Sequence, residues 1–166
     1  MRRFPALAAA LLLFSSHANA DFNDGVYALL TGEYDTALQH LVPLAETSDH
    51  AYAQYFLGRM YDRGQGVEQN YDTAAKWYRK ASEKGVADAQ YRLGLLYTEG
   101  TGVPKDPEYA YGWYSVAAHL GNNKAIAALE SSQKQLSSEE LAEARKLSAQ
   151  LIEKYGTVSD ETARRQ

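Results

Sequence analysis

The stretch GRMYDRGQGV, residues 58–67, places three glycines within ten positions and recurs as GLLYTEGTGV at 94–103. Glycine-rich backbone can cradle a phosphate, because consecutive N–H groups then point at one anion. A phosphate loop of the GxGxxG type also needs a preceding strand and a following helix N-terminus. No strand-like alternation precedes either copy. We therefore interpret these glycines as joints between helices rather than as a ligand site.

A second chemical pattern is the S-x-x-K spacing of Ser131 and Lys134, which is typical of serine β-lactamases and penicillin-binding proteins. Those enzymes also require S-D-N and K-T-G motifs, to which Ser48-Asp49-His50 is the nearest approach. They also need a β-sheet, and none is expected here. β-Lactamase-like acyl transfer therefore ranks last among the functions considered, and no catalytic residue is predicted.

Metal chemistry is not indicated either. His40, His50 and His119 lie in different units, without the i, i+4 spacing that brings two ligands onto one helix face. Five carboxylates lie near loops or helix starts, where a negative charge complements the helix dipole; they are Asp62, Glu68, Asp72, Glu99 and Glu108. No metal ion and no cofactor is predicted.

Residues 1–20 have the pattern of a secretory signal peptide. Arg2 and Arg3 give a positive start, residues 6–14 an apolar core, and Ala18-Asn19-Ala20 a small-residue cleavage site. The apolar run is about half of the roughly 20 residues that a transmembrane helix needs. We expect cleavage before Asp21 and export of the remaining chain, with no membrane insertion.

The charge of the exported chain excludes some partners. Without Arg2 and Arg3 the chain has 15 basic and 21 acidic side chains, a formal charge of −6. Nucleic acids and anionic lipids both require a basic face, so neither is an expected partner. The chain has no cysteine, so its stability must come from packing within one domain.

An internal repeat dominates the sequence, because residues 51–86 align with residues 87–122 at a constant offset of 36. The matching pairs are Ala51/Ala87, Gln54/Gln90, Tyr55/Tyr91, Leu57/Leu93, Gly58/Gly94, Tyr61/Tyr97, Gly64/Gly100, Gly66/Gly102, Val67/Val103, Ala74/Ala110, Trp77/Trp113, Tyr78/Tyr114, Ala81/Ala117 and Gly85/Gly121. A fixed period between 20 and 50 residues indicates stacked supersecondary units.

Each unit contains two apolar stripes with helical spacing. The first comprises Ala53, Leu57, Met60 and Tyr61, repeated by Ala89, Leu93, Leu96 and Tyr97. The second comprises Ala74, Trp77, Tyr78 and Ala81, repeated by Ala110, Trp113, Tyr114 and Ala117. Each unit is therefore expected to be a helix, a loop and a second helix.

The ends and joints of these helices can also be predicted. Asn70 and Asp106 are candidate N-caps, and Pro107 follows at the first helical position, which tolerates proline. Gly58 and Gly94 lie in the middle of a helix, where glycine costs roughly 1 kcal/mol relative to alanine. Close approach of the paired helix would offset that cost.

The flanks are interpreted as atypical end units of a stack. Residues 21–50 form an N-terminal capping helix pair. The apolar set of its first helix comprises Phe22, Val26, Leu29 and Leu30, and Pro43 should kink the second helix or end it early. Residues 123–155 form a C-terminal capping pair, whose last helix opens with a capping box of Ser137 and Glu140. Residues 156–166 are polar and are expected to be a flexible tail.

The tandem motif AxAQYxLGxxYxxGxGV followed by AxxWYxxA resembles the Sel-one-like repeat (SLR) family, a relative of the tetratricopeptide repeats. The resemblance implies an all-α fold, a right-handed α/α superhelix of about four helix hairpins. It further implies a monomeric adaptor or regulator in the bacterial periplasm that binds a protein or peptide partner. Some cysteine-rich members are associated with β-lactam binding, but this chain lacks cysteine.

The same resemblance suggests where a partner binds. In tetratricopeptide repeats the concave groove is lined by first-helix residues outside the core. Matching the Leu-Gly pairs at 57–58 and 93–94 transfers that groove to Tyr52, Tyr55, Arg59, Asp62, Arg63, Asp88, Tyr91, Leu95, Thr98 and Glu99. Tyrosine and arginine are frequent interface hot spots, although the two repeated tyrosines can also serve packing.

Two functional classes stay open on the sequence. The first is a non-catalytic, exported protein–protein adaptor. The second is an accessory protein of cell-envelope polysaccharide or peptidoglycan, in which aromatic rings would stack on sugars. Trp77 and Trp113 distinguish the two, because buried tryptophans would leave few platforms for a glycan.

Overall fold

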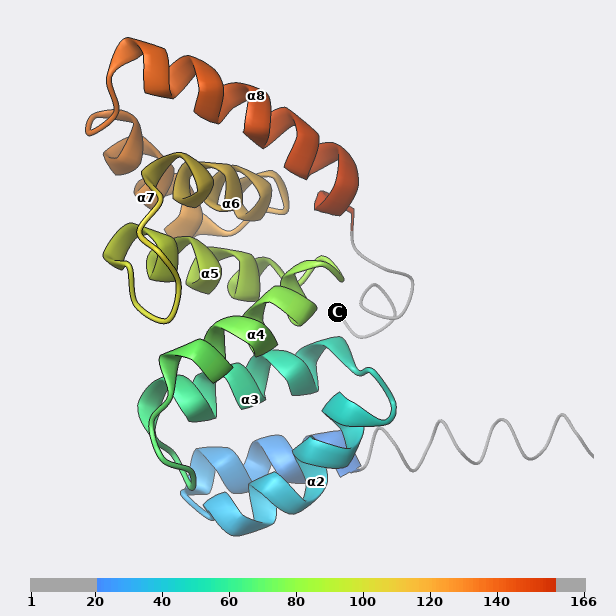
Figure 1. The fold of residues 1–166 in the computed structure, drawn as a ribbon. Coiled ribbons are helices and arrows are strands. Elements are labelled where there is room, and N and C mark those ends of the chain that lie inside the picture. The colour runs from blue at the N-terminus through green and yellow to red at the C-terminus, as the bar shows by residue number, and fades with distance from the viewer. Residues whose placement is uncertain (1–20, 158–166) are drawn as a thin grey trace, which may run out of the picture.

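The computed structural model describes residues 21–157 (Figure 1). Residues 21–31 are helical and are called the N-terminal helix. The helices that follow are α2 (Tyr34–Glu46), α3 (Ala51–Arg63), α4 (Tyr71–Ser82), α5 (Ala87–Glu99), α6 (Pro107–His119), α7 (Asn123–Gln133) and α8 (Ser138–Tyr155). No strand occurs between residues 21 and 157. The signal-peptide prediction, and the tail prediction beyond residue 157, lie outside the described residues.

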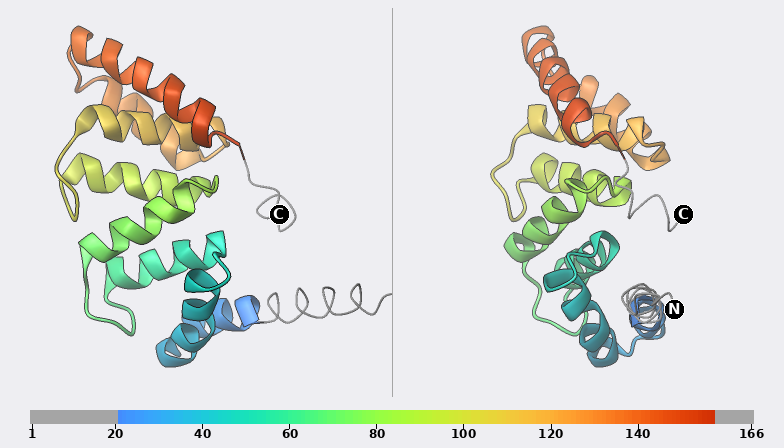
Figure 2. Two further views of the ribbon diagram at one scale, coloured as in Figure 1. Left: turned by 45° about the vertical axis from the view of Figure 1, so that its right-hand side comes forward. Right: turned by 90° about the vertical axis from the view of Figure 1, so that its right-hand side faces the viewer.

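The helices stack as hairpins, which confirms the expected α-solenoid. α3 packs on α4 and α5 on α6 within hairpins, and the contacts of α2 with α3 and of α4 with α5 join one hairpin to the next. Two further views show the same stack, from the N-terminal helices at one end to α8 at the other (Figure 2). Both α7 and α8 pack on α6, so the C-terminal end of the stack is closed by two helices.

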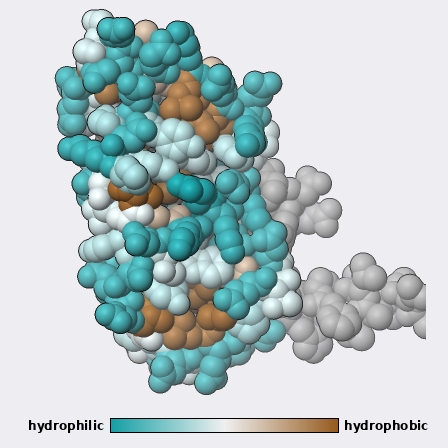
Figure 3. All heavy atoms as spheres, in the orientation of Figure 1, coloured by the Kyte–Doolittle hydropathy of each residue, from teal (hydrophilic) through white to brown (hydrophobic). Residues whose placement is uncertain are grey.

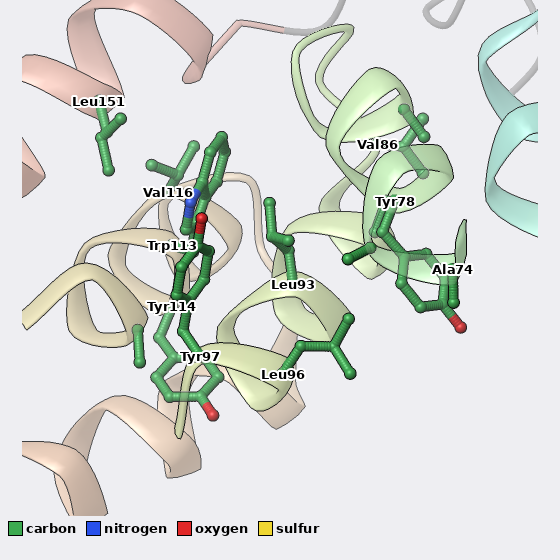
Figure 4. Close-up of a cluster of buried hydrophobic side chains, with 14 of the residues drawn as sticks. Ala74, Tyr78, Val86, Leu93, Leu96, Tyr97, Trp113, Tyr114, Val116 and Leu151 are labelled. Carbon is green, nitrogen blue, oxygen red and sulfur yellow. The ribbon is translucent and has the colours of Figure 1, made fainter. Parts of the chain in front are cut away.

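The core runs between the hairpins as two clusters of buried side chains. One joins α4, α5, α6 and α8, and includes Tyr78, Leu93 and Trp113. Figure 4 shows the α5 side chains between those of α4 and those of α6. The other cluster joins the N-terminal helix, α2 and α3, and includes Leu41 and Met60. Each of the two repeat hairpins, α3–α4 and α5–α6, thus packs against a neighbour on both sides, as stacked repeats require.

The helix-interior glycines allow close approach, as expected. A Cβ added to Gly58 would lie 2.6 Å from Cδ1 of Tyr78, and one on Gly94 would lie 2.5 Å from Cε1 of Tyr114. The tyrosine rings of the second helices therefore occupy the space that a side chain would need. Gly25 in the N-terminal helix has the same role, because its Cβ would meet Leu41 at 2.9 Å.

The repeated glutamines have a role that the sequence did not reveal. Both are fully buried, and each ties a first helix to the C-terminal carbonyls of the hairpin before it. Gln54 Nε2 donates to the carbonyl of Ala45 at 3.2 Å, and Gln90 Nε2 donates to the carbonyl of Ser82 at 3.0 Å. Carbonyls at a helix C-terminus have no partner within the helix, so these bonds satisfy them and stabilise the stacking of hairpins.

The caps are as predicted. The side chains of Asn70 and Asp106 accept from the backbone N–H groups of Thr73 and Tyr109. Ser137 and Glu140 form both bonds of the capping box.

Two features of the N-terminal flank differ from the sequence-based prediction. α2 continues through Pro43 and ends three residues later at Glu46, because a proline in the last turn removes only one backbone donor. Leu30, assigned with Phe22, Val26 and Leu29 to the apolar set of the first helix, is 73% exposed.

Candidate functional site: a groove along the first helices

The ten predicted groove residues lie on α3 and α5, the first helices of the two repeats. Tyr52, Tyr55, Arg59, Asp62, Tyr91, Leu95 and Thr98 are half-buried, whereas Arg63, Asp88 and Glu99 are exposed. The set therefore follows the partly accessible side of these two helices and avoids the fully buried positions. These side chains suit binding rather than catalysis, because none of the ten forms a nucleophile–base pair with another.

An aromatic residue stands three positions before the close-approach glycine in each of three hairpins: Phe22, Tyr55 and Tyr91. The centroid of the Tyr55 ring lies 6.0 Å from that of Tyr78, tilted by 41°. Tyr91 has the same distance and angle to Tyr114. One side of each tyrosine thus packs on the second helix, and the half-buried ring leaves its remaining surface for a partner.

Arg59 lies within this aromatic row. Its guanidinium carbon is 5.8 Å from the ring centroid of Tyr55 and 5.4 Å from that of Phe56, within the range of cation–π contact. Its Nε is buried and has no hydrogen-bond partner. The equivalent position in the second repeat is Leu95, which packs against the core cluster instead. A cationic group in one repeat is therefore replaced by an aliphatic group in the other.

Asp62 and Thr98, at equivalent positions, are engaged in the fold. The hydroxyl of Tyr78 donates to Oδ2 of Asp62 at 3.0 Å. A hydrogen bond of 2.8 Å joins Thr98 Oγ1 and the hydroxyl of Tyr114. Burial, with the neighbouring carboxylate of Asp62, raises the pKa of Tyr78 far above that of a free tyrosine. Burial raises the pKa of Tyr114 to about 12, while the hydrogen bond with Thr98 opposes the shift.

Asp88 is also occupied, since Asn122 Nδ2 donates to its Oδ1 at 2.9 Å. Tyr52, its equivalent, packs against the core cluster and lies 6.5 Å from the ring of Phe22. Arg63 and Glu99 end α3 and α5 and point away from the core. The structure therefore brings the tyrosines and Arg59 together as an accessible row, and assigns Asp62, Thr98 and Asp88 mainly to contacts within the fold.

The groove extends onto the N-terminal helix, a part that was not predicted from the sequence. A hollow of about 490 Å³ lies between that helix and α3, lined by Phe22, Asn23, Val26, Tyr27, Leu30, Tyr52 and Phe56. Tyr27 and Leu30 are 68% and 73% exposed. Figure 3 shows that hydrophobic areas are few on the side it displays, and that one of them lies over the N-terminal helices. The spacing of Phe22 and Gly25, which repeats that of Tyr55 and Gly58, was the available signal.

The tryptophans offer no open platform for a sugar. Trp113 is 2% exposed and stacks on Tyr155 with ring centroids 5.6 Å apart. Trp77 is half-buried, and the ammonium of Lys80 lies 4.3 Å above its ring. This geometry favours the protein-binding class over the glycan-binding class.

The other chemical patterns find no support in the fold. Ser131 lies in the last turn of α7 and Lys134 is its C-cap; both are exposed. Within residues 21–157, no group of three or more His, Asp or Glu side chains is arranged to hold a metal ion. None of the described helices combines the length and apolar character needed to cross a membrane.

Comparison with known proteins agrees with this architecture. The Sel1 repeat family model matches residues 51–86 and 87–122. A search of the curated proteins gives no match. Among solved structures, the chain is 32% identical to c5321, a protective antigen present in uropathogenic Escherichia coli strains that displays an SLR fold. The TM-score is 0.80, over 89% of this chain and 32% of that one.

A Sel1 repeat protein from Oxalobacter formigenes is also 32% identical, with a TM-score of 0.63 over 78% of this chain and 55% of that one. The chain thus spans about a third of the first structure's length and about half of the second's. Sel1 repeats generally mediate protein–protein interactions and are typically non-catalytic scaffolds. The chain is therefore a Sel1-like repeat protein, with its two repeats at residues 51–86 and 87–122.

Proposed function

We propose that this chain is an exported, non-catalytic adaptor that holds a partner protein or peptide in the groove along the N-terminal helix, α3 and α5. The observation that carries the proposal is the accessible row of Phe22, Tyr55 and Tyr91 beside the hollow next to Phe56. Aromatic and arginine side chains in a partly desolvated recess supply most of the binding free energy in protein interfaces. The groove combines both kinds of side chain.

The proposed site of action is the periplasm. The support is the positive, apolar and small-residue pattern of residues 1–20, together with the family resemblance. A monomer is the proposed working form. A glycan-binding role in the cell envelope is the weaker alternative, because the tryptophans that could stack on sugars are buried or covered by a lysine.

The test is affinity capture of partners from the cell that exports the protein, followed by mass spectrometry. Arg59→Glu reverses the charge in the groove, and Lys76→Glu makes the same change in charge at an exposed position of α4. We expect Arg59→Glu to lose a partner that the unchanged protein and Lys76→Glu both retain. Circular dichroism should be the same for all three proteins. Equal capture by all three would exclude Arg59 from the binding site, and capture of no protein at all would exclude the adaptor role.

A further inference from the structure

Arg59 lies against the ring of Tyr55 in the middle of the groove, with its guanidinium carbon 5.8 Å from the ring centroid. Burial and then Asp88 raise the pKa of Tyr55, while Arg59, Arg92 and Arg63 act in the opposite direction. Arg59 and Arg63 come from α3, and Arg92 comes from α5. Arginines of both first helices thus act on Tyr55, against the opposing charge of Asp88.

These arginines have no carboxylate partner among residues 21–157. None of the ion pairs found there includes Arg59, Arg63 or Arg92. The two carboxylates of the same region have other donors, since Tyr78 binds Asp62 and Asn122 binds Asp88. Arg59 also retains a buried Nε without an acceptor. A buried donor left unsatisfied costs about 1–3 kcal/mol, which a bound acceptor would recover.

The positive charge adjoins the apolar hollow. Phe56 lines the hollow and also lies beneath the guanidinium of Arg59, so one side chain borders both features. The hollow is lined by aromatic and aliphatic side chains from the N-terminal helix and α3, with Asn23 as its only amide. In a ligand that fills the hollow with an apolar side chain, the groups next to that side chain therefore lie near Arg59.

The chain as a whole is acidic, with 21 acidic and 17 basic side chains. A long polyanion such as a nucleic acid needs an extended basic face, whereas the arginine that adjoins the apolar recess here is Arg59. Short carboxylates next to hydrophobic side chains fit it better, because guanidinium groups bind carboxylates with paired hydrogen bonds.

We infer that the groove selects an acidic, hydrophobic peptide segment of a partner protein, with an apolar side chain in the hollow beside Phe56 and a carboxylate on Arg59. This inference rests on the proposed adaptor function and specifies its ligand. The first repeat sets the preference for acid, because Leu95 and Glu99 replace Arg59 and Arg63 at the equivalent positions of the second repeat.

The experiment measures the affinity of the purified protein for three series of short fluorescein-labelled peptides, by fluorescence anisotropy. The apolar positions, Leu or Phe, are the same in all three series. The neighbouring positions hold Glu in the first series, Gln in the second and Lys in the third. We expect the Glu series to bind about tenfold more tightly than the Gln series, and the Lys series to bind more weakly than both. The advantage of the Glu series should shrink as salt is raised.

Three variants locate the effect. Arg59→Leu introduces the residue that the second repeat has at this position, and should bring the affinity of the Glu series close to that of the Gln series. Lys76→Leu removes one positive charge from the exposed face of α4, and should change neither series. Phe56→Ala should weaken the Glu and Gln series alike, because it opens the hollow that both apolar side chains use.

Two results separate failure of this inference from failure of the proposed function. Equal affinities for the three series, with Phe56→Ala still weakening them, would overturn the acid preference and leave the groove as a peptide site. No binding of any series at about 1 mM would overturn the inference, and the adaptor role would then depend on the capture experiment. Concentration-dependent dimers that Phe56→Ala abolishes would identify a second copy of the chain as the occupant and would also overturn it.

Discussion

In the first repeat Tyr78 donates a hydrogen bond to a carboxylate, Asp62, whereas in the second repeat the equivalent Tyr114 is bonded to a hydroxyl, Thr98. The backbone scaffold around the two pairs is the same, including the glycine against each tyrosine ring. The differences accumulate on the accessible side of the first helices, where Phe56 is replaced by Arg92. Repetition thus preserves the contacts that stack hairpins and leaves the groove free to differ from one unit to the next.

The largest expected effects come from the glycines that the two repeats share. Gly58→Ala and Gly94→Ala should each lower the free energy of unfolding by about 2 kcal/mol, because a Cβ would overlap a tyrosine ring. This loss should appear even though alanine favours a helix by about 1 kcal/mol. Urea unfolding followed by circular dichroism measures it. Gly112→Ala is the control and should cost less, since its Cβ would meet a terminal methyl group of Leu151, at 2.8 Å, rather than a rigid ring. A stabilised Gly94→Ala would contradict the packing role.

The buried glutamines should come next, and should differ between repeats. Gln90→Leu leaves the carbonyls of Ser82 and Tyr155 without this donor, and should cost about 2 kcal/mol of unfolding free energy. Gln54→Leu leaves the carbonyl of Ala45 and Oδ1 of Asp49 without this donor, and should cost less because the Asp49 side chain is exposed and can bind water instead. Gln39→Leu, at an exposed position of α2, should change stability by less than about 0.5 kcal/mol. Thermal and urea unfolding measure all three, and equal stability of Gln90→Leu and the parent would remove the glutamines from the stacking mechanism.

Exchange of the hydroxyl partners should have smaller effects. Asp62→Thr gives the first repeat the arrangement of the second and should change the free energy of unfolding by less than about 1 kcal/mol, because the Tyr78 hydroxyl keeps an acceptor. Asp62→Leu removes the acceptor and should cost about 1 kcal/mol more than Asp62→Thr. If the two variants were equally stable in urea, the hydrogen bond to Tyr78 would contribute nothing to the fold.

Alkaline pH should separate the two tyrosines by a still smaller margin. Burial raises both pKa values above the unfolded value near 10, Tyr114 to about 12 and Tyr78 further because of Asp62. Since only the neutral form is stable in the fold, stability should be constant below pH 10 and should fall as the pH rises from 10 towards 12.

Tyr78→Phe should therefore remove only slightly more of this alkaline loss than Tyr114→Phe at pH 11, because that pH lies below both folded-state pKa values. Melting temperatures at pH 9 and pH 11 measure it, with Tyr27→Phe, at an exposed position, as the control. The buried hydroxyls would not control the alkaline loss of stability if the melting temperature did not fall between these two pH values. The same would follow if all three variants reduced that loss equally.

Most of the fold of residues 51–122 could be predicted because its signals are local. The 36-residue period, the apolar stripes and the caps at Asn70 and Asp106 are all contained in short windows of sequence. The site was predicted less completely. Its N-terminal part was missed because the N-terminal helix joins α2 through only two residues, whereas a longer glycine loop follows α3, so Phe22 does not align with Tyr55 at the repeat offset.

Contacts between helices explain the other differences between expectation and structure. Asp88 was a plausible groove residue, but its bond to Asn122 depends on how closely α7 follows α5. Arg59 Nε is buried without a hydrogen-bond partner, because the stacked helices of residues 21–157 bring no acceptor within its reach. Neither relation is encoded in spacing along one helix.

By itself the amino-acid sequence of this protein determined the helices, their caps and their order as repeated hairpins, since hydrophobic periodicity and capping act over a few residues. Only the tertiary structure decided which groove side chains form contacts within the fold and which remain accessible to a partner. The physical reason is that hydrogen bonding and burial of a side chain depend on distances between atoms far apart in the chain, and these exist only once the hairpins are stacked.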